Sequence, residues 1–452
     1  MKFTRLVLVS LMCAVSLSGC AKLGLSGGKD KKRTPVMGNR ISILSSEQGI
    51  EPDPALAGVQ VIVPEAVIND AWAQPGGNAS KSVGHLAVGQ ALGKLWSVKI
   101  NGSSKAERLA AAPVVSGGNL YAVDVNGVLN AFSASTGRKL WAQDVNAAPK
   151  GSQSSLFGGG VSVDGDTVFA TNGLGDVVAM DAASGTRKWK VHPAGPLRGA
   201  PTVSNGNVYV MTQDSQLLAI SQADGATVWT QSASLEITGV FGNSSPAAAQ
   251  GSVVAGFSSG GLKAHRYENG RPLWGDTLSR TSMSTSVSSL SDIDANPVID
   301  RGRVFAIGQG GRMVSMDLVT GQRLWELSLA GVSSPWVAGE WVFVVDDQAR
   351  LLCVSRTTGK VRWLTQLQRY KKQKEKNGRT VKAKDPISWV GPVLAGGRLI
   401  LANSRGELFN VAPETGAVQT RTSVGAPVSF GPVVANNTLY IMDDEGRISA
   451  WR

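Results

Sequence analysis

A short pattern, in which a glycine precedes a tryptophan by four residues, recurs along most of this chain. "STGRKLW" ends at Trp141 and "TTGKVRW" ends at Trp363, and a further copy, "ETGAVQT", has Thr420 where the tryptophan is expected. The full pattern ends at six tryptophans: Trp141, Trp189, Trp229, Trp274, Trp325 and Trp363. A pattern that recurs along the chain in this way indicates one supersecondary unit that is repeated many times. The structure of a single unit is therefore the first question.

The interior of each unit predicts four short strands. In residues 112–145, "LYAVDV" alternates apolar and polar side chains, "NG" follows as a tight turn, and "VLNAFSA" and "KLWAQDV" are separated by "STG". Alternation with period two, bounded by glycine-containing turns, is typical of antiparallel hairpins. No segment keeps apolar residues at helical spacing over several turns. The chain is therefore predicted to be all-β.

Counting the units predicts an eight-bladed β-propeller of four-stranded antiparallel blades over residues 84–452. The last unit ends with the chain and lacks its outer strand, and "LGKLWSVKI" (92–100) supplies a strand with its own tryptophan, Trp96. Pairing of this N-terminal strand with the C-terminal blade would close the ring and leave no exposed sheet edge at the junction. The seven tryptophans are expected to be structural and to pack neighbouring blades together.

The first residues predict export rather than fold. Residues 1–19 combine an early positive charge with a short apolar run, as in a signal peptide, and "LSGC" resembles the bacterial lipobox, in which Cys20 is lipidated. Ala21 after the cysteine resembles the sorting signal for the outer membrane. Residues 20–83, rich in Gly, Pro and Ser, are predicted to be a lipidated N-terminus and flexible tether. Cys353 is then the only thiol left, so no disulfide framework is possible.

The formal net charge of +12 is concentrated in two basic segments, residues 29–33 and 369–384. In an exported protein, such segments favour anionic lipid headgroups or an acidic protein surface over nucleic acid. A solvated linker and a solvated insertion explain the same charges equally well. The composition does not favour one interpretation over the other.

The glycine–tryptophan repeats also resemble those of quinoprotein dehydrogenases, whose propellers bind pyrroloquinoline quinone and calcium. Those enzymes typically carry a vicinal cysteine pair, which this chain lacks, and His85, His192 and His265 are not clustered. We therefore expect no enzymatic activity, no catalytic residues and no cofactor. A dehydrogenase dependent on pyrroloquinoline quinone remains the alternative.

Two local motifs resemble functional sites but have the wrong context. "GFSSG" matches a nucleophile elbow, yet Ser258 aligns with a hairpin turn of the repeat instead of a strand-to-helix turn. "DIDANP" places Asp292, Asp294 and Asn296 as in a calcium loop, but proline follows where such loops have glycine. No metal site is predicted.

Unequal connections between blades point to a binding surface. From the tryptophan to the next inner strand, 17, 23 and 29 residues separate Trp229 from Pro246, Trp274 from Pro297 and Trp363 from Pro392, whereas the connections that follow Trp189, Trp325 and Thr420 take 10 to 12 residues. Connections longer than closure requires are usually functional. Loops 235–246 and 280–297 and the basic insertion 366–385 should leave the same face. The first offers Leu235 and Ile237 as apolar contacts, and the second offers Asp292 and Asp294 as fixed charge.

The lipobox, the eight tryptophan-repeat blades and these two loops together resemble the BamB family of outer-membrane assembly lipoproteins. The resemblance implies a monomeric, non-catalytic scaffold that docks on a periplasmic POTRA domain of BamA and aids the folding of unfolded outer-membrane β-barrel clients. It implies a lipid-anchored protein at the periplasmic face of the outer membrane. The family's Leu-x-Leu-Arg-Gly contact pattern falls on Leu235, Ile237, Thr238 and Gly239, with threonine in place of arginine. Its Asp-x-Asp falls on Asp292 and Asp294.

Overall fold

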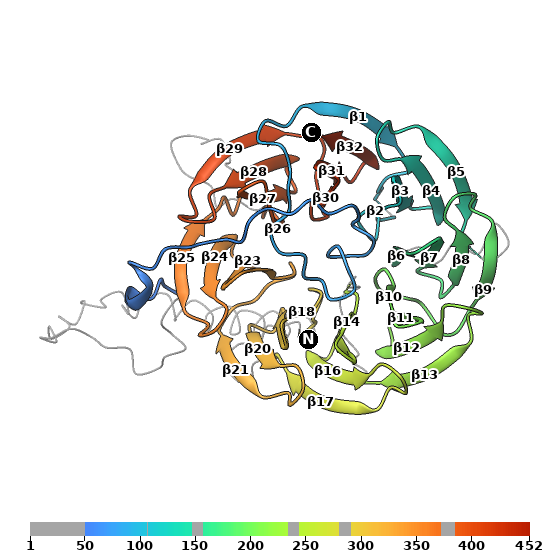
Figure 1. Ribbon diagram of the computed structural model, residues 1–452, viewed down its shortest axis with the longest axis horizontal. Coiled ribbons are helices and arrows are strands. Elements are labelled where there is room, and N and C mark those ends of the chain that lie inside the picture. Colours follow the sequence, from blue (N-terminus) through green and yellow to red (C-terminus); the bar gives the residue numbers. More distant parts are fainter. Residues whose placement is uncertain (1–49, 106, 147–156, 234–243, 280–290, 372–384) are drawn as a thin grey trace, which may run out of the picture. The chain divides into compact units, whose positions relative to one another are not determined.

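Short strands joined by tight turns make up nearly all of the chain that the structure describes. The computed structural model describes residues 50–105, 107–146, 157–233, 244–279, 291–371 and 385–452. Within these ranges there are thirty-two strands and one 3₁₀ turn, η1 (Pro54–Leu56). The strands form eight separate four-stranded sheets arranged around an axis (Figure 1). The predicted eight-bladed, all-β propeller is confirmed.

Seven blades are built from four strands that are consecutive in the sequence, paired antiparallel from the innermost to the outermost. Blade 1 contains β2 (Val114–Ser116), β3 (Asn119–Val123), β4 (Val128–Ser133) and β5 (Lys139–Asp144). Blade 2 contains β6 (Gly159–Asp164), β7 (Thr167–Asn172), β8 (Val177–Asp181) and β9 (Arg187–Val191). Blade 3 contains β10 (Thr202–Ser204), β11 (Asn207–Met211), β12 (Gln216–Ser221) and β13 (Thr227–Ser232). Blade 4 contains β14 (Ala247–Ala249), β15 (Ser252–Gly256), β16 (Gly261–Arg266) and β17 (Pro272–Thr277).

The remaining blades follow the same order, and the last one joins the two ends of the ring. Blade 5 contains β18 (Val298–Asp300), β19 (Arg303–Ile307), β20 (Met313–Asp317) and β21 (Arg323–Leu327). Blade 6 contains β22 (Trp336–Ala338), β23 (Trp341–Val345), β24 (Arg350–Ser355) and β25 (Val361–Gln366). Blade 7 contains β26 (Trp389–Ala395), β27 (Arg398–Asn403), β28 (Glu407–Val411) and β29 (Val418–Ser423). Blade 8 contains β30 (Val433–Ala435), β31 (Thr438–Met442), β32 (Arg447–Trp451) and the N-terminal strand β1 (Lys94–Lys99).

The predicted closure of the ring is confirmed by the register of blade 8. β1 pairs antiparallel with β32, so that Trp96 lies opposite Ala450. The turn residues of the innermost hairpins show why such short strands can pair. Between β10 and β11, Asn205 and Gly206 both have positive φ, of 52° and 75°, as a tight turn between twisted antiparallel strands requires.

Each repeat tryptophan connects its own blade to the next one, as predicted. The indole N–H donates to a backbone carbonyl of the following blade, over 2.7 to 3.2 Å, in all seven cases: Trp96 to Ala134, Trp141 to Ala182, Trp189 to Gln222, Trp229 to Tyr267, Trp274 to Leu318, Trp325 to Arg356 and Trp363 to Pro413. The ring also packs flat on the repeat glycine of that blade. At Gly359, with φ of +73°, an added Cβ would lie 2.7 Å from the Trp325 ring. The spacing of glycine and tryptophan therefore encodes a contact between blades.

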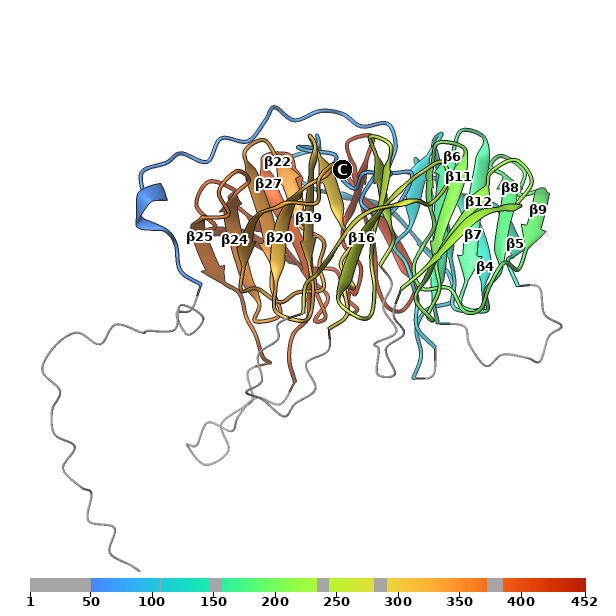
Figure 2. The ribbon, with the colours of Figure 1, turned by 90° about the horizontal axis from the view of Figure 1, so that it is seen from below.

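Residues 50–83 differ from the flexible tether that their composition predicts, because most of them pack against the propeller. Val61 and Trp72 are buried, and Trp72 stacks on Trp336 with 6.1 Å between ring centroids. We call residues 50–93 the N-terminal strap. It crosses one face of the propeller before the chain enters β1 (Figures 1 and 2). The tether prediction for residues 20–49 lies outside the described residues.

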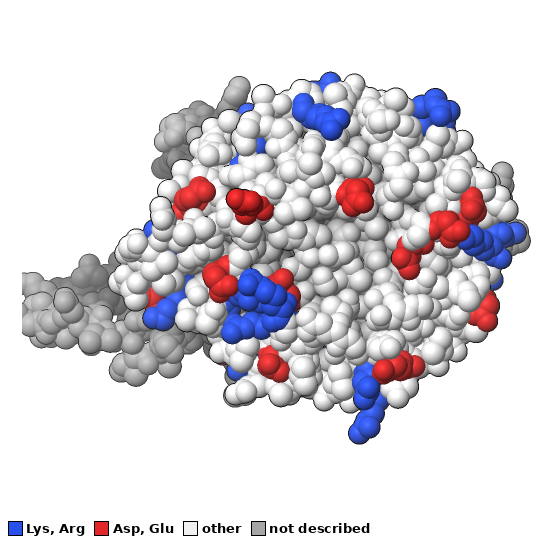
Figure 3. Space-filling view, viewed as in Figure 1, with Lys and Arg blue, Asp and Glu red and all other residues white. Residues whose placement is uncertain are grey.

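The inner part of the strap, residues 69–86, hydrogen-bonds to the innermost strand of every blade or to the residue that follows it. In order around the ring, the pairs are Asn69 with Val434 and Asn436, Trp72 with Val115, Ala73 with Val163, Gln74 with Val203, Ala79 with Ala248, Ser80 with Ile299, Gly84 with Trp336, and Leu86 with Leu394 and Gly396. We call residues 69–86 the ring segment. It covers one end of the central channel, and charged side chains are sparse in the middle of that face (Figure 3).

Among the described residues, no helix is long and apolar enough to cross a membrane. Nor do those residues contain a group of three or more His, Cys, Asp or Glu side chains that could hold a metal ion. Ser258 lies in the turn between β15 and β16. Its predicted place in a hairpin is confirmed.

Candidate functional site

Asp292 and Asp294 lie in the last residues of the long connection from β17 to β18, directly before β18 begins. Both carboxylates face Arg198, which lies in the connection from β9 to β10. One guanidinium nitrogen, Nη2, donates to Asp292 Oδ1 over 2.8 Å and to Asp294 Oδ1 over 3.0 Å. The Asp292 and Arg198 side chains are each only 1% exposed, and that of Asp294 is 9% exposed. The two aspartates thus form a buried ion-pair cluster with an arginine two blades earlier.

Two further side chains complete this cluster. The other guanidinium nitrogen of Arg198, Nη1, donates to Ser258 Oγ over 2.8 Å. Gln309 donates through its amide to Asp294 Oδ2, and its backbone N–H donates to the carbonyl of Asp292 over 2.9 Å. We call Arg198, Ser258, Asp292, Asp294 and Gln309 the Arg198 cluster. Because its members come from connections and turns of blades 3, 4 and 5, it ties three blades together.

The cluster holds two carboxylates against one guanidinium, and its electrostatics follow from that imbalance. Burial and the neighbouring charge of Asp292 raise the pKa of Asp294 to about 6, although Arg198 and Gln309 act in the opposite direction. Asp292 Oδ2 is buried and has no hydrogen-bond partner in the described part of the chain. A buried carboxylate oxygen without a donor is costly. The site can therefore take up a proton or a further donor near neutral pH.

The structure differs from the sequence prediction in how these aspartates are presented. They were expected to project as free charge on a docking loop, whereas Asp292 is fully buried and Asp294 nearly so. The physical reason is Arg198, whose own buried charge requires carboxylate partners. Whether the two aspartates contribute to partner binding stays a prediction.

Arg198 is the residue that sequence reasoning missed. By sequence, the family pattern of leucine, arginine and glycine falls in loop 235–246, where Thr238 replaces the arginine. The triplet Leu197-Arg198-Gly199 stands one blade earlier, and its arginine is the one that reaches the two aspartates. The three letters were visible in the sequence. Only the ring geometry, however, places blade 3 within reach of the connection into blade 5.

The ends of the two predicted docking loops lie side by side. Ser245 N–H donates to Asn296 Oδ1 over 2.7 Å, and Ser244 Oγ donates to the carbonyl of Ala295 over 3.2 Å. Residues 235–243, including the predicted contacts Leu235, Ile237, Thr238 and Gly239, lie outside the described residues, as do 280–290. What the structure describes is a shared, hydrogen-bonded base for both loops.

Beside this base, the central channel contains a cavity of about 190 Å³, lined by Asp294, Asn296 and Ser245 and bounded by the ring segment residues Trp72 and Lys81. The Lys81 amine donates to Thr202 Oγ1 over 2.9 Å. Its burial lowers the pKa of this lysine to about 7. The ring segment and the Arg198 cluster therefore border one and the same chamber.

The basic insertion predicted over 366–385 is described only at its two ends. Tyr370 pairs with Pro386 across its base. Near this base, Lys371, Arg405 and Arg421 line a surface groove with Gln368. Residues 372–384, which hold most of the positive charge, lie outside the described residues. Cys20 and the signal peptide, residues 1–19, also lie outside them.

Comparisons with known proteins agree with this architecture. The family described as "Outer membrane protein assembly factor BamB" matches residues 82–155 and 125–365. The BamB of Shigella dysenteriae is 30% identical over 74% of this chain and 82% of its own length, and that of Yersinia pestis is 27% identical over 79% and 88%.

Two solved structures share the fold at lower identity. BamB from Moraxella catarrhalis has a TM-score of 0.64 at 18% identity, and covers 80% of this chain and 100% of its own. The quinohemoprotein alcohol dehydrogenase of Comamonas testosteroni has a TM-score of 0.65 at 14% identity, over 85% and 81%. At these identities both likenesses concern the propeller alone, whereas the family match extends over more than half of the sequence. The chain belongs to the BamB family of outer membrane protein assembly factors.

Proposed function

We propose that this chain is a non-catalytic scaffold subunit of the machinery that assembles β-barrel proteins into the outer membrane, and that it docks on the POTRA domains of BamA. Its membership of the BamB family carries this proposal, since the relatives it matches are named as outer membrane protein assembly factors. The docking surface is proposed at the base shared by loops 235–246 and 280–297. The scaffold is proposed to aid the folding of unfolded β-barrel clients.

The geometry of that base supports a division of labour between the two loops. The apolar side chains Leu235 and Ile237, with Thr238 and Gly239 beside them, are proposed to make the contact itself. Asp292 and Asp294 are proposed to act mainly through Arg198, which fixes the end of their own loop. Ser244 and Ser245 hydrogen-bond to the end of loop 280–297, and these bonds are proposed to fix the end of loop 235–246 as well. Fixing a loop in its bound shape reduces the entropy cost of binding.

The proposed location follows from the N-terminal sequence. Residues 1–19 are proposed to direct export, and Cys20 to carry the lipid that anchors the protein at the periplasmic face of the outer membrane. The protein is proposed to act there as a monomer, without a cofactor.

Co-purification from detergent-solubilised membranes tests the docking surface. Replacing Leu235 and Ile237 together by glutamate should reduce recovery of BamA at least about tenfold, because two buried apolar contacts are lost. Val319→Glu, at an exposed apolar position in the turn between β20 and β21, is the matched control and should leave recovery unchanged. Unchanged recovery with the double variant would contradict the proposed surface.

A further inference from the structure

The seam between blades 7 and 8 is built differently from the other seven. In every other outer strand a tryptophan reaches across to the next blade, whereas β29 has Thr420 at that position. All six residues of β29 are exposed, and no other outer strand is exposed along its whole length. The outer half of this seam therefore lacks the indole that fills its counterparts.

Blade 7 differs from the other blades also in the residues that pair with the tryptophan position across neighbouring strands. In blade 1, Tyr121, Ala131 and Trp141 lie side by side across three strands. The middle position of this row is alanine, serine or cysteine in all seven blades that carry the tryptophan: Ala131, Ala179, Ala219, Ala264, Ser315, Cys353 and Ala450. In blade 7 the row is Ile400, Asn410 and Thr420.

The other side of the seam explains this change. Elsewhere, the indole packs on the glycine of the turn between the third and fourth strands of the next blade. Blade 8 has no such turn, because its third strand is β32 and its fourth is β1, which comes from the N-terminal part of the chain. Gly93 and Arg452 instead exchange two backbone hydrogen bonds, of 2.8 and 2.9 Å. The segment leading into β1 lies beside residues of β28 and β29 at this seam, since Gln90, Ala91 and Leu92 line one groove with Leu408 and Thr420. The closure of the ring has thus removed the surface on which an eighth tryptophan would rest.

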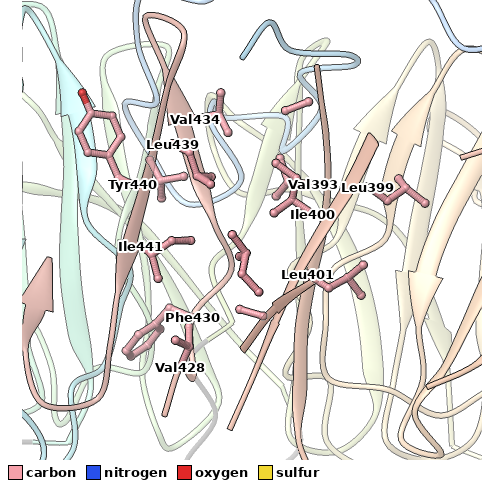
Figure 4. Close-up of a cluster of buried hydrophobic side chains, with 14 of the residues drawn as sticks. Val393, Leu399, Ile400, Leu401, Val428, Phe430, Val434, Leu439, Tyr440 and Ile441 are labelled. Atoms are coloured by element: carbon pink, nitrogen blue, oxygen red, sulfur yellow. The ribbon is translucent and has the colours of Figure 1, made fainter. Parts of the chain in front are cut away.

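The inner half of the seam is nevertheless well packed. Side chains of β26 and β27, including Val393 and Ile400, gather with Leu439 and Ile441 of β31 between the two blades (Figure 4). Farther out, a cavity of about 230 Å³ remains, lined by Leu92, Leu408, Thr420, Val424 and Trp451. We call it the seam groove. Because an apolar cavity of about 150 Å³ is enough to bind benzene, this groove is large enough for an aromatic ring.

One polar atom of the seam groove favours an aromatic ring that carries a donor. Asn410 lines the groove, and its amide donates to Thr420 Oγ1 over 2.6 Å. Its Oδ1 is buried and has no hydrogen-bond partner in the described part of the chain. In the other seams, the indole N–H donates to an acceptor of the neighbouring blade. If the Asn410 side chain turns toward the groove, an indole N–H or phenol O–H there would satisfy this buried oxygen.

We propose that the seam groove binds an aromatic side chain, tryptophan or tyrosine, presented on an extended polypeptide segment that runs along β29. The segment is extended because β29 pairs on one side only, with β28, and its exposed outer edge can accept a further strand. An unfolded barrel strand would be such a segment. The proposal rests on the proposed function for this natural ligand, while the groove itself is tested without the assembly machinery.

The test uses two fluorescent ten-residue peptides with purified full-length protein. One peptide alternates threonine with tryptophan, and the other has alanine for every tryptophan. Fluorescence anisotropy should show about tenfold tighter binding of the tryptophan peptide, because only it can fill the groove. Thr420→Trp fills the groove from within and should remove this preference. Thr230→Trp, at an exposed position of β13 next to the docked Trp229, is the matched control and should keep it.

Two results would overturn the proposal: equal affinity for both peptides, or a preference that Thr420→Trp leaves intact. Thermal unfolding establishes that Thr420→Trp is folded, and Thr420→Phe, with a smaller ring, replaces it if it is not. The measurement is independent of docking on BamA. Loss of peptide preference with unchanged recovery of BamA supports the groove as a separate surface. If only the docking test fails, the peptide result still supports binding at the seam groove.

Discussion

At the scale of single residues, Arg198 decides how the loop with the Asp-x-Asp is held. A guanidinium that is 1% exposed is tolerated because acceptors surround it, among them two carboxylates and a hydroxyl. The same ion pairs turn Asp292 and Asp294 inward. The two carboxylates that the sequence predicts for partner binding therefore form ion pairs within the propeller.

Arg198→Met should destabilise the protein by about 3–5 kcal/mol, because it leaves two buried carboxylates without a counter-ion. The expected readout is a lower midpoint in urea unfolding. Adding Asp292→Asn and Asp294→Asn to this variant removes the orphaned charges and should recover most of the loss. If Arg198→Met unfolds at the wild-type urea concentration, the cluster does not stabilise the fold.

Lys81 in the ring segment should make stability depend on pH above neutrality. Its pKa falls from 10.5 to about 7 on folding because the amine is buried, so between these values the unfolded chain binds more protons than the folded one. Stability should then rise with pH from about 7 to 10, by up to about 1.4 kcal/mol per pH unit from this group. Lys81→Met should be more stable than wild type at pH 7, and its advantage should shrink as the pH rises. Urea unfolding of both proteins at pH 7, 8 and 9 measures this, and parallel pH profiles would contradict it.

At the scale of elements, the ring segment acts as a second closure of the propeller. β1 joins the ends of the ring at its rim, whereas residues 69–86 join all eight innermost strands at its centre. The rim closure was predictable from the repeat count. The central one was not, because irregular backbone that pairs one residue per blade leaves neither a periodic pattern nor a motif in the sequence.

Deleting residues 69–86 should lower the thermal unfolding midpoint strongly, since hydrogen bonds to eight blades are lost at about 1 kcal/mol each and the apolar contacts of Trp72 and Leu86 are lost as well. Deleting residues 50–60 instead retains the ring segment and should have a much smaller effect. Differential scanning calorimetry compares the two truncations. Equal midpoints would mean that the ring segment does not contribute to stability.

At the scale of the whole molecule, the propeller offers several distinct surfaces in addition to the chamber in its central channel. The ring segment covers one end of the channel, the Arg198 cluster lies at the base of the two predicted docking loops, and the seam groove lies on the rim between blades 7 and 8. A scaffold that holds a docking partner and an extended client at once needs separate surfaces of this kind. The proposed function thus assigns the docking partner to the loops, and the further inference assigns the extended client to the rim.

By itself, the sequence determined the blades, their number and their closure. Hairpin turns, strand alternation and the glycine–tryptophan contact each depend on residues close together in the chain or at a constant repeat, so the pattern can be counted. Only the tertiary structure decided that Arg198 meets Asp292 and Asp294, that residues 69–86 visit every blade, and that the seam at Thr420 stays open. These contacts join residues from different blades or from opposite ends of the chain. They arise from closing the ring, which no local pattern encodes.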